Sequence, residues 1–292
     1  MIRNTAKWIL AAACALTLSA CGGNEKEAQV AARYVPERMD DFMFENDLIA
    51  GRIYGKALEG NPTAPGIDIW VKQPGALVAD MRYKMELEEG KSYHKDWGNG
   101  KDCYKVGVSL GGGASAVLLD GEIQYPATNY RSWEILEQSP YKVVFVLHYP
   151  EWEAKGEKIA LDKKFTVTPG SYFVQVEDSW TFSGAYGDEL TVAAGVFRHP
   201  AQNTVTDEIV LKDRYALWEH ASDQSGEPED GMIGVAVHVP GAEGSIVTED
   251  GTHGLTYKKI KSGETFSYSF GSCWSKAGVK TAAQWFETVR GL

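Results

Sequence analysis

The sequence predicts an all-β protein, a large antiparallel β-sandwich with a short helix near its C-terminus. Two observations lead to this fold class. Many segments either alternate apolar and polar residues or are rich in β-branched and aromatic residues, which is typical of strands. Turn sequences with glycine or proline separate these segments, and helical periodicity is rare. Residues 34–292 greatly exceed the roughly 100 residues of an immunoglobulin-size sandwich, so we expect one large domain there.

The predicted strands follow one another along the chain, with turn residues between them. They are residues 68–72, 141–149, 158–167, 171–182, 190–197, 231–239 and 265–270. The alternation is clearest in the fourth of these strands, where Tyr172, Val174 and Val176 share one face. An antiparallel sandwich is the simplest way to bury the apolar faces of so many strands.

Two helices are expected, one at each end of the domain. A short helix is predicted at the start of residues 30–42. The second is predicted over residues 281–289, because Thr281 can cap a helix and Gln284 stands three residues later.

The first residues have the pattern of a bacterial lipoprotein signal. A short basic region precedes an apolar run, residues 8–18, which is too short to span a bilayer. Residues 18–21 read Leu-Ser-Ala-Cys and resemble a lipobox, with cleavage before Cys21 and lipid attached to it. We therefore expect a signal peptide over residues 1–20, a lipidated tether over residues 21–33, and a protein held on the membrane of the bacterial cell envelope. An ordinary signal peptide with an incidental cysteine is the alternative.

The charge and the missing motifs exclude several functions. The net charge is −11, and the chain has no basic run, so nucleic acid is not expected as a partner. A local group of arginine or lysine side chains could still bind an anionic substrate. Serine-hydrolase, zinc-protease, P-loop and dinucleotide-binding motifs are all absent from the sequence. Cys103 and Cys273 could form a disulfide in an oxidising compartment, or remain two buried thiols.

The most informative segment is residues 93–107, which is polar, aromatic and interrupted by glycine. A segment of this composition predicts a functional loop on a rigid scaffold. His94 titrates near neutrality and could abstract a proton. Tyr104 and Lys105 could donate a proton or stabilise charge, and Trp97 offers a flat face to a sugar ring.

The same loop also allows a calcium site. Asp96, Gly98, Gly100 and Asp102 stand at alternating positions, with Asn99 between the glycines, and this spacing is similar to that of calcium-binding loops. The final glutamate of an EF-hand is missing. We therefore expect no cofactor and keep calcium as the alternative.

A second group of candidate residues lies upstream, in residues 44–55. Arg52 and Tyr54 would share one face of a strand, and the planar guanidinium of Arg52 suits a carboxylate or a sulfate. A structural salt bridge from Arg52 to Glu45 or Asp47 is the alternative. The remaining residues that we expect to bind substrate are Asn46, His199 and Trp274.

The chain also resembles a known family. Residues 38–47, 66–72, 93–107, 111–113, 230–236 and 274–276 carry the resemblance, which extends over nearly the whole mature chain. The family is bacterial, is catalogued as a domain of unknown function, and occurs in loci for acidic polysaccharides such as pectin and ulvan. The resemblance implies a galactose-mutarotase-like supersandwich and an elimination reaction on uronate-containing oligosaccharides.

These observations together predict a carbon–oxygen lyase, either a glycan lyase or a dehydratase. Both reactions begin by removing the proton alpha to the uronate carboxylate. In this scheme Arg52 or Lys105 neutralises the carboxylate, His94 removes the proton, and Tyr104 protonates the leaving oxygen. A glycoside hydrolase on acidic oligosaccharides and a non-catalytic carbohydrate-binding lipoprotein are the alternatives.

Overall fold

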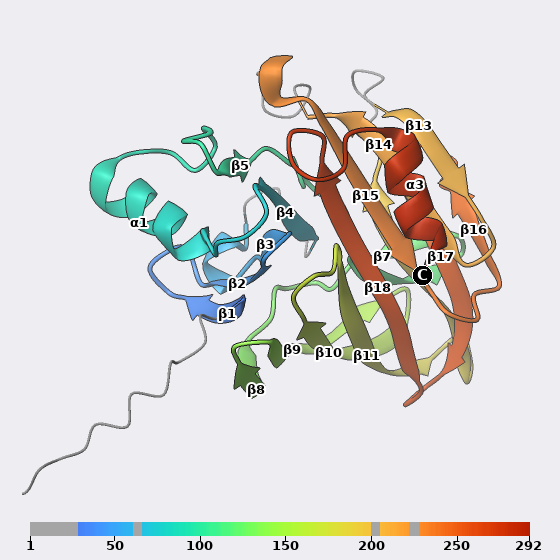
Figure 1. Ribbon diagram of the computed structural model, residues 1–292. Helices are drawn as coiled ribbons and strands as arrows, with labels where there is room; N and C mark the ends of the chain where they lie inside the picture. Colours follow the sequence, from blue (N-terminus) through green and yellow to red (C-terminus); the bar gives the residue numbers. More distant parts are fainter. Residues whose placement is uncertain (1–28, 61–65, 200–204, 222–227) are drawn as a thin grey trace, which may run out of the picture.

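The computed structural model describes residues 29–60, 66–199, 205–221 and 228–292, and these residues form three antiparallel sheets (Figure 1). Cys21 and the predicted signal peptide lie outside the described residues. Within the described part, no helix is both long enough and apolar enough to cross a membrane. The all-β fold with a short C-terminal helix agrees with the prediction.

The first sheet is a meander in which each strand pairs with the next along the chain. Its strands are β1 (Val30–Val35), β2 (Asp41–Asn46), β3 (Ala50–Ile53), β4 (Ile67–Lys72) and β5 (Gly100–Asp102). The helix α1 (Ala79–Glu89) connects β4 to the loop before β5, and packs on this sheet through Tyr83 against Trp70. Figure 1 shows the first sheet and α1 together on one side of the two larger sheets.

The other two sheets form the sandwich. The eight-stranded sheet has the order β13 (Val205–Val210), β14 (Arg214–His220), β15 (Met232–His238), β18 (Thr265–Trp274), β11 (Phe173–Gly184), β10 (Glu157–Val167), β9 (Lys142–Ala154) and β8 (Ser132–Ser139). The third sheet has the order β16 (Gly244–Val247), β17 (His253–Lys261), β12 (Glu189–Phe197), β6 (Ser115–Leu119) and β7 (Glu122–Gln124).

Apolar side chains from all three sheets form one buried cluster. Phe42 of the first sheet stacks on Phe145 of the eight-stranded sheet, with ring centroids 4.5 Å apart, and Phe44 meets Phe270 edge to face at 5.7 Å. The first sheet is therefore packed against the sandwich rather than tethered beside it, since rings of this size carry much of the energy of burial.

The C-terminal helix α3 (Ala282–Arg290) covers the outer face of β14 and β15, as Figure 1 shows. Thr281 caps it, as predicted, and accepts a hydrogen bond from the backbone N–H of Gln284 at 3.3 Å. Trp285 is fully buried and stacks on Phe173 at 5.5 Å. The helix thus shields the part of the eight-stranded sheet around β14 and β15 from water.

Three expectations differ from the structure. The predicted helix at the start of residues 30–42 is wrong, because β1 and β2 occupy this segment. The strand β1 begins at Val30, so the last four residues of the predicted tether pair in the first sheet. The helix α1 was not expected, because only Ala79, Arg82 and Tyr83 of its residues are buried and its apolar pattern is correspondingly weak.

Of the two alternatives for Cys103 and Cys273, the structure shows two buried free thiols.

Candidate active site

The loop between α1 and β5 has its two ends joined by hydrogen bonds. The backbone N–H of Tyr93 donates to Glu86 of α1 at 2.9 Å, and the N–H of Asp102 donates to the carbonyl of Tyr93 at 2.8 Å. Asp96 accepts hydrogen bonds from the N–H groups of Gly98 and Gly100 at 2.8 and 3.0 Å. The loop is therefore built by its own polar groups and returns to the point where it began.

His94 lies at the surface of this loop with its ring oriented by Asp102. Its side chain is 60% exposed, and its Nδ1 lies 3.3 Å from the backbone oxygen of Asp102 and 3.5 Å from a carboxylate oxygen of the same residue. A carbonyl oxygen only accepts, so Nδ1 carries the hydrogen. The lone pair of His94 is consequently on Nε2, the ring nitrogen that has no partner among the described residues.

The surroundings of His94 favour the neutral form of the imidazole. Partial burial against the Tyr93 ring, with centroids 4.7 Å apart, lowers the pKa of His94 below 6.5, and the nearby charge of Arg52 lowers this pKa further. The hydrogen bond to Asp102 opposes this shift. A neutral histidine with a free Nε2 is the form that accepts a proton near pH 7.

Arg52 is the centre of a buried ion cluster and does not face a groove. Its Nε donates to Asp68 at 2.7 Å, its Nη1 to Asp41 at 3.1 Å and its Nη2 to Asp102 at 3.1 Å. Nη1 also donates to the hydroxyl of Tyr93 at 2.9 Å. Only 5% of Arg52 is exposed. The alternative of a structural salt bridge describes Arg52 correctly, but its partners are these three aspartates.

The register of the first sheet explains the cluster. Arg52 on β3 stands directly opposite Asp68 on β4, and Trp70 on β4 stands opposite Asp102 on β5. Tyr54 donates to the same oxygen of Asp68 at 3.1 Å and is itself buried. Arg52 and Tyr54 are both buried, so the structure does not support the substrate-binding role expected for them.

Three carboxylates surround one guanidinium in this cluster. Burial raises the pKa of Asp41 and of Asp102 to about 6, and that of Asp68 to about 7. The positive charge of Arg52 opposes each shift. Asp102 thus joins two groups: one of its carboxylate oxygens faces both the guanidinium of Arg52 and the imidazole of His94.

The other predicted residues of the loop lie at its far end, next to His199. Tyr104 is buried, points its hydroxyl at the carbonyl of Phe197 at 3.4 Å, and meets the His199 ring edge to face. Lys105 is exposed, and its backbone oxygen accepts from Nε2 of His199 at 2.7 Å. Nδ1 of His199 lies 3.0 Å from both carboxylate oxygens of Glu219. The structure therefore brings Tyr104, Lys105 and His199 together, but it buries the Tyr104 hydroxyl that was expected to protonate a leaving group.

The side chain of Asn46 has a structural role, because it joins two segments of the chain by hydrogen bonds. Its amide nitrogen donates to the backbone oxygens of Thr168 and Ser171 at 2.7 and 2.8 Å. Its side-chain oxygen accepts from the N–H groups of Leu48 and Ile49, both at 2.8 Å. These four bonds leave the Asn46 amide no free group for a substrate.

The two candidate tryptophans differ in exposure. Trp97 is 43% exposed, and its indole N–H donates to the backbone oxygen of Ser92 at 2.9 Å, which leaves the ring open to solvent. The ammonium of Lys95 lies 5.1 Å from the centre of this ring. Trp274 is buried and donates to the backbone oxygen of Asp230 at 2.7 Å, so it belongs to the core and cannot stack on a sugar.

The three residues of the calcium alternative have different partners. The carboxylate of Asp102 faces Arg52, that of Asp96 accepts from loop N–H groups, and Asn99 accepts from Nε of Arg82 at 3.4 Å. Across the described part of the chain, no three histidine, cysteine or acidic side chains are arranged to hold a metal ion. The geometry of the loop favours its role as a support for His94.

Arg38 contacts Tyr93, the residue next to His94 in the chain, and sequence reasoning missed it. Its Nε donates to the hydroxyl of Tyr93 at 2.9 Å, and its guanidinium lies 5.7 Å from the centre of the Tyr93 ring. No local pattern marks Arg38, because its neighbours come from a loop more than 50 residues away. Asp102 was considered only as a metal ligand, for the same reason.

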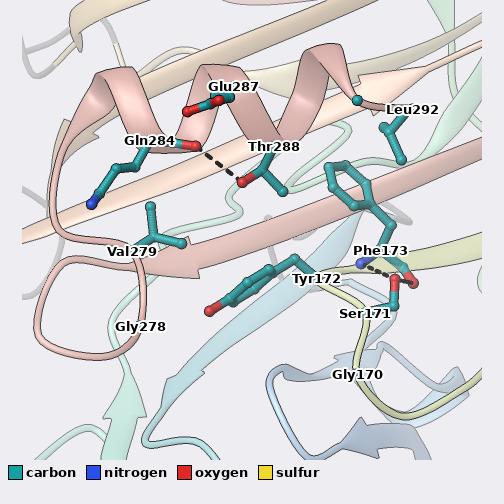
Figure 2. Close-up of a pocket in the computed structure, with 11 residues that line it drawn as sticks. Gly170, Ser171, Tyr172, Phe173, Gly278, Val279, Gln284, Glu287, Thr288 and Leu292 are labelled. Atoms are coloured by element: carbon teal, nitrogen blue, oxygen red, sulfur yellow. Dashed lines mark hydrogen bonds between the residues drawn. The ribbon is translucent and has the colours of Figure 1, made fainter.

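A groove lies apart from this loop, beside α3 (Figure 2). It measures about 570 Å³, and Figure 2 shows Tyr172 and Phe173 on one side and Gln284, Glu287 and Thr288 of α3 on the other. Its lining contains no histidine, lysine or arginine, and the charged side chain in it is a glutamate. Glu287 would repel a uronate carboxylate there and no cationic side chain would offset it, so this groove does not replace the loop as the candidate site.

The family comparison gives one clear result. A family model described as "Domain of unknown function (DUF4861)" matches residues 21–292, which is nearly the whole chain. The chain belongs to this family. The match confirms that the sequence resembles a family of unknown function, and it leaves the link to polysaccharide loci as a proposal.

Individual relatives add little about function. An uncharacterized protein of Formosa agariphila is 31% identical over 229 residues, which are 75% of this chain and 54% of that protein. The chain thus spans about half the length of this curated relative.

Solved structures with some similarity include a GH36 α-galactosidase of Geobacillus stearothermophilus, with TM-score 0.40, 10% identity and coverage of 85% of this chain and 41% of that one. A galactose mutarotase related enzyme of Lactobacillus acidophilus has TM-score 0.30 and 8% identity, with coverage of 83% and 98%. Likenesses this weak carry no argument about activity.

Proposed function

We propose that this protein is a carbon–oxygen lyase that acts on uronic-acid-containing oligosaccharides, as a glycan lyase or as a dehydratase. The observation that carries the proposal is the geometry of His94. Its Nδ1–H is held by the backbone oxygen of Asp102, its Nε2 has no partner among the described residues, and burial lowers its pKa, which favours a neutral base at the surface.

The reaction needs such a base because the proton alpha to a carboxylate is only weakly acidic. In the proposed mechanism Nε2 of His94 takes this proton, and its electron pair forms the double bond to the beta carbon as the bond from that carbon to the leaving oxygen breaks. Asp102 stabilises the imidazolium that results, because its carboxylate lies 3.5 Å from Nδ1. Asp102 is a positioning residue in this scheme, and His94 alone touches the reacting atoms.

The leaving oxygen also needs a proton. Tyr104 was expected to supply it, but its hydroxyl is buried at the other end of the loop. We therefore assign this step to the imidazolium of His94, which returns the proton to the leaving oxygen when both bonds lie on one face of the sugar ring. If the oxygen belongs to another sugar the product is a shorter chain, and if it leaves as water the enzyme is a dehydratase.

The substrate class and the location rest on the sequence. The resemblance to a family from acidic-polysaccharide loci supports an acidic oligosaccharide, and Trp97 offers a partly exposed ring in the same loop as His94, on which a sugar could stack. The lipobox supports a protein anchored in the bacterial cell envelope through Cys21.

The experiment is to incubate the purified protein with uronate oligosaccharides and to follow absorbance of the unsaturated uronate together with product masses. Loss of one water from an intact chain indicates a dehydratase, and chain cleavage without uptake of water indicates a lyase. Uptake of water indicates a hydrolase, and binding without any product indicates a carbohydrate-binding protein. Either of these last two results contradicts the proposal.

The role of His94 has a matched control in the same chain. His94→Ala should lower turnover by about 10²–10⁴-fold, the range for loss of a general base. His148 also pairs with an aspartate, Asp162 at 2.7 Å, but lies on β9. His148→Ala should leave turnover unchanged. Full activity in His94→Ala would remove His94 from the mechanism.

A further inference from the structure

The turn between β1 and β2 has a strained backbone. Met39 and Asp40 have φ angles of 53° and 60°, which place two consecutive residues with side chains in the left-handed region. Residues other than glycine rarely adopt this conformation, and each one costs of order 1–3 kcal/mol. Such strain persists only where the surrounding structure imposes it, and it is often found at functional sites.

Contacts from β1 and from residues farther along the chain impose this conformation. The hydroxyl of Tyr34 donates to the carboxylate of Asp40, and the hydroxyl of Tyr130 donates to its backbone oxygen. Gly55 packs so closely on the turn that a Cβ atom there would lie 1.7 Å from the same backbone oxygen. The turn is thus held in one shape from three directions.

The shape of the turn places Arg38 against Tyr93, the residue that precedes the candidate base in the chain. Nε of Arg38 donates to the hydroxyl of Tyr93 at 2.9 Å, which anchors the guanidinium at that ring. The guanidinium of Arg38 and the ring of His94 lie 5.7 and 4.7 Å from the centre of the Tyr93 ring. Both groups therefore pack on one aromatic ring, Arg38 half-buried and His94 exposed.

Arg38 differs from most other described arginines because it forms no ion pair with a described carboxylate, although its charge opposes the rise that burial causes in the pKa of Asp41. Within the described residues, those that form ion pairs with carboxylates are Arg33, Arg52, Arg131, Arg198 and Arg214. Among the described residues no carboxylate lies within 4 Å of Arg38, and only its Nε donates a hydrogen bond, which leaves the two terminal nitrogens to donate to a ligand. Arg82 is buried on backbone oxygens, and Arg290 lies on α3, away from His94.

We propose that the guanidinium of Arg38 binds the carboxylate of the sugar acid that His94 attacks. The two terminal nitrogens match the two oxygens of a carboxylate, and the pairing neutralises the charge that would oppose removal of the adjacent proton. The catalytic meaning of this contact rests on the elimination proposed above. The binding of the carboxylate itself is measured without turnover, so the two proposals can fail separately.

The experiment titrates the full-length protein with glucuronate and with galacturonate, each against its uncharged methyl ester, by nuclear magnetic resonance. The wild type should bind at least one of the two acids about tenfold or more tightly than its ester, as expected for a charge-assisted pair. Arg38→Gln should abolish this preference. Arg38→Lys should keep only part of it, because an ammonium lacks the planar fork.

Arg33 provides the matched control, because it lies on the same hairpin, is similarly exposed and already pairs with Asp80 and Glu37. Arg33→Gln should retain the preference for the acid. No preference in the wild type, or a preference that persists in Arg38→Gln, overturns the proposal. If the preference is lost as expected but no unsaturated product ever forms, Arg38 is a carboxylate site and the elimination is wrong.

Discussion

Replacing Arg52 with methionine tests the buried ion cluster directly. Methionine keeps a flexible chain of similar reach but removes the guanidinium that pairs with Asp41, Asp68 and Asp102. The three carboxylates would then share a buried space without a compensating charge inside the cluster. We expect the variant to be strongly destabilised and His94 to lose its fixed orientation, because Asp102 joins the two.

The expected decrease in the free energy of unfolding follows from the burial of the ion pairs. Removing one partner of a buried ion pair costs about 3–5 kcal/mol, and here one removal leaves three carboxylates unpaired. We therefore expect a loss near the upper end of that range, against a total stability of about 5–15 kcal/mol for a typical domain. At about 2–4 °C per kcal/mol, the melting temperature should fall by roughly 10–20 °C.

The loss of stability in Arg52→Met should also depend on pH and should increase as the pH rises. Asp41, Asp68 and Asp102 have pKa values of about 6, 7 and 6 in the folded protein, above the ordinary 3.8. The folded state thus binds more protons than the unfolded state between these values, and stability falls as the pH rises through them. Without Arg52 these pKa values rise further, so the deficit of the variant should be smallest near pH 4 and should grow up to and beyond pH 7.

The assay is urea unfolding of both proteins at several pH values. Arg33→Met is the control, because its pairs with Asp80 and Glu37 are partly exposed and surface pairs contribute about 0–1 kcal/mol. A loss of stability below about 1 kcal/mol in Arg52→Met, or a loss that does not change between pH 4 and pH 7, would refute the conclusion that Arg52 stabilises the first sheet through its three buried ion pairs.

Three further predictions concern the rest of the chain. Cys21→Ser should move the protein from the membrane fraction to the soluble fraction, and a variant that stays membrane-bound contradicts lipidation. Activity should survive a chelator, because Asp96 and Asp102 already have other partners; activity lost in chelator and restored by calcium would make these residues central. Cys103 and Cys273 should react with thiol reagents only after unfolding, because burial raises the pKa of both thiols; mass mapping of labelled peptides checks this, and labelling of the native protein would contradict it.

The strands and the C-terminal helix could be read from the sequence because their signals are local. Alternation along β11 places every second side chain on the core face, and this periodicity holds whatever the strand pairs with. The cap of α3 likewise needs only Thr281 and Gln284. The helix α1 was not predicted because few of its residues are buried. The strand β1 was not predicted because it follows a segment with the composition of a tether.

The candidate loop was also visible in the sequence, because its polar and glycine-rich composition is a local property. Its chemistry was decided by tertiary structure. Whether Arg52 binds a substrate or three aspartates depends on the register of β2, β3, β4 and β5, which brings together residues separated by up to about 60 positions. The exposure of Arg38 depends on a turn held by Tyr130 and Gly55. Pairing between distant strands is a property of the whole sheet, and no local pattern specifies it.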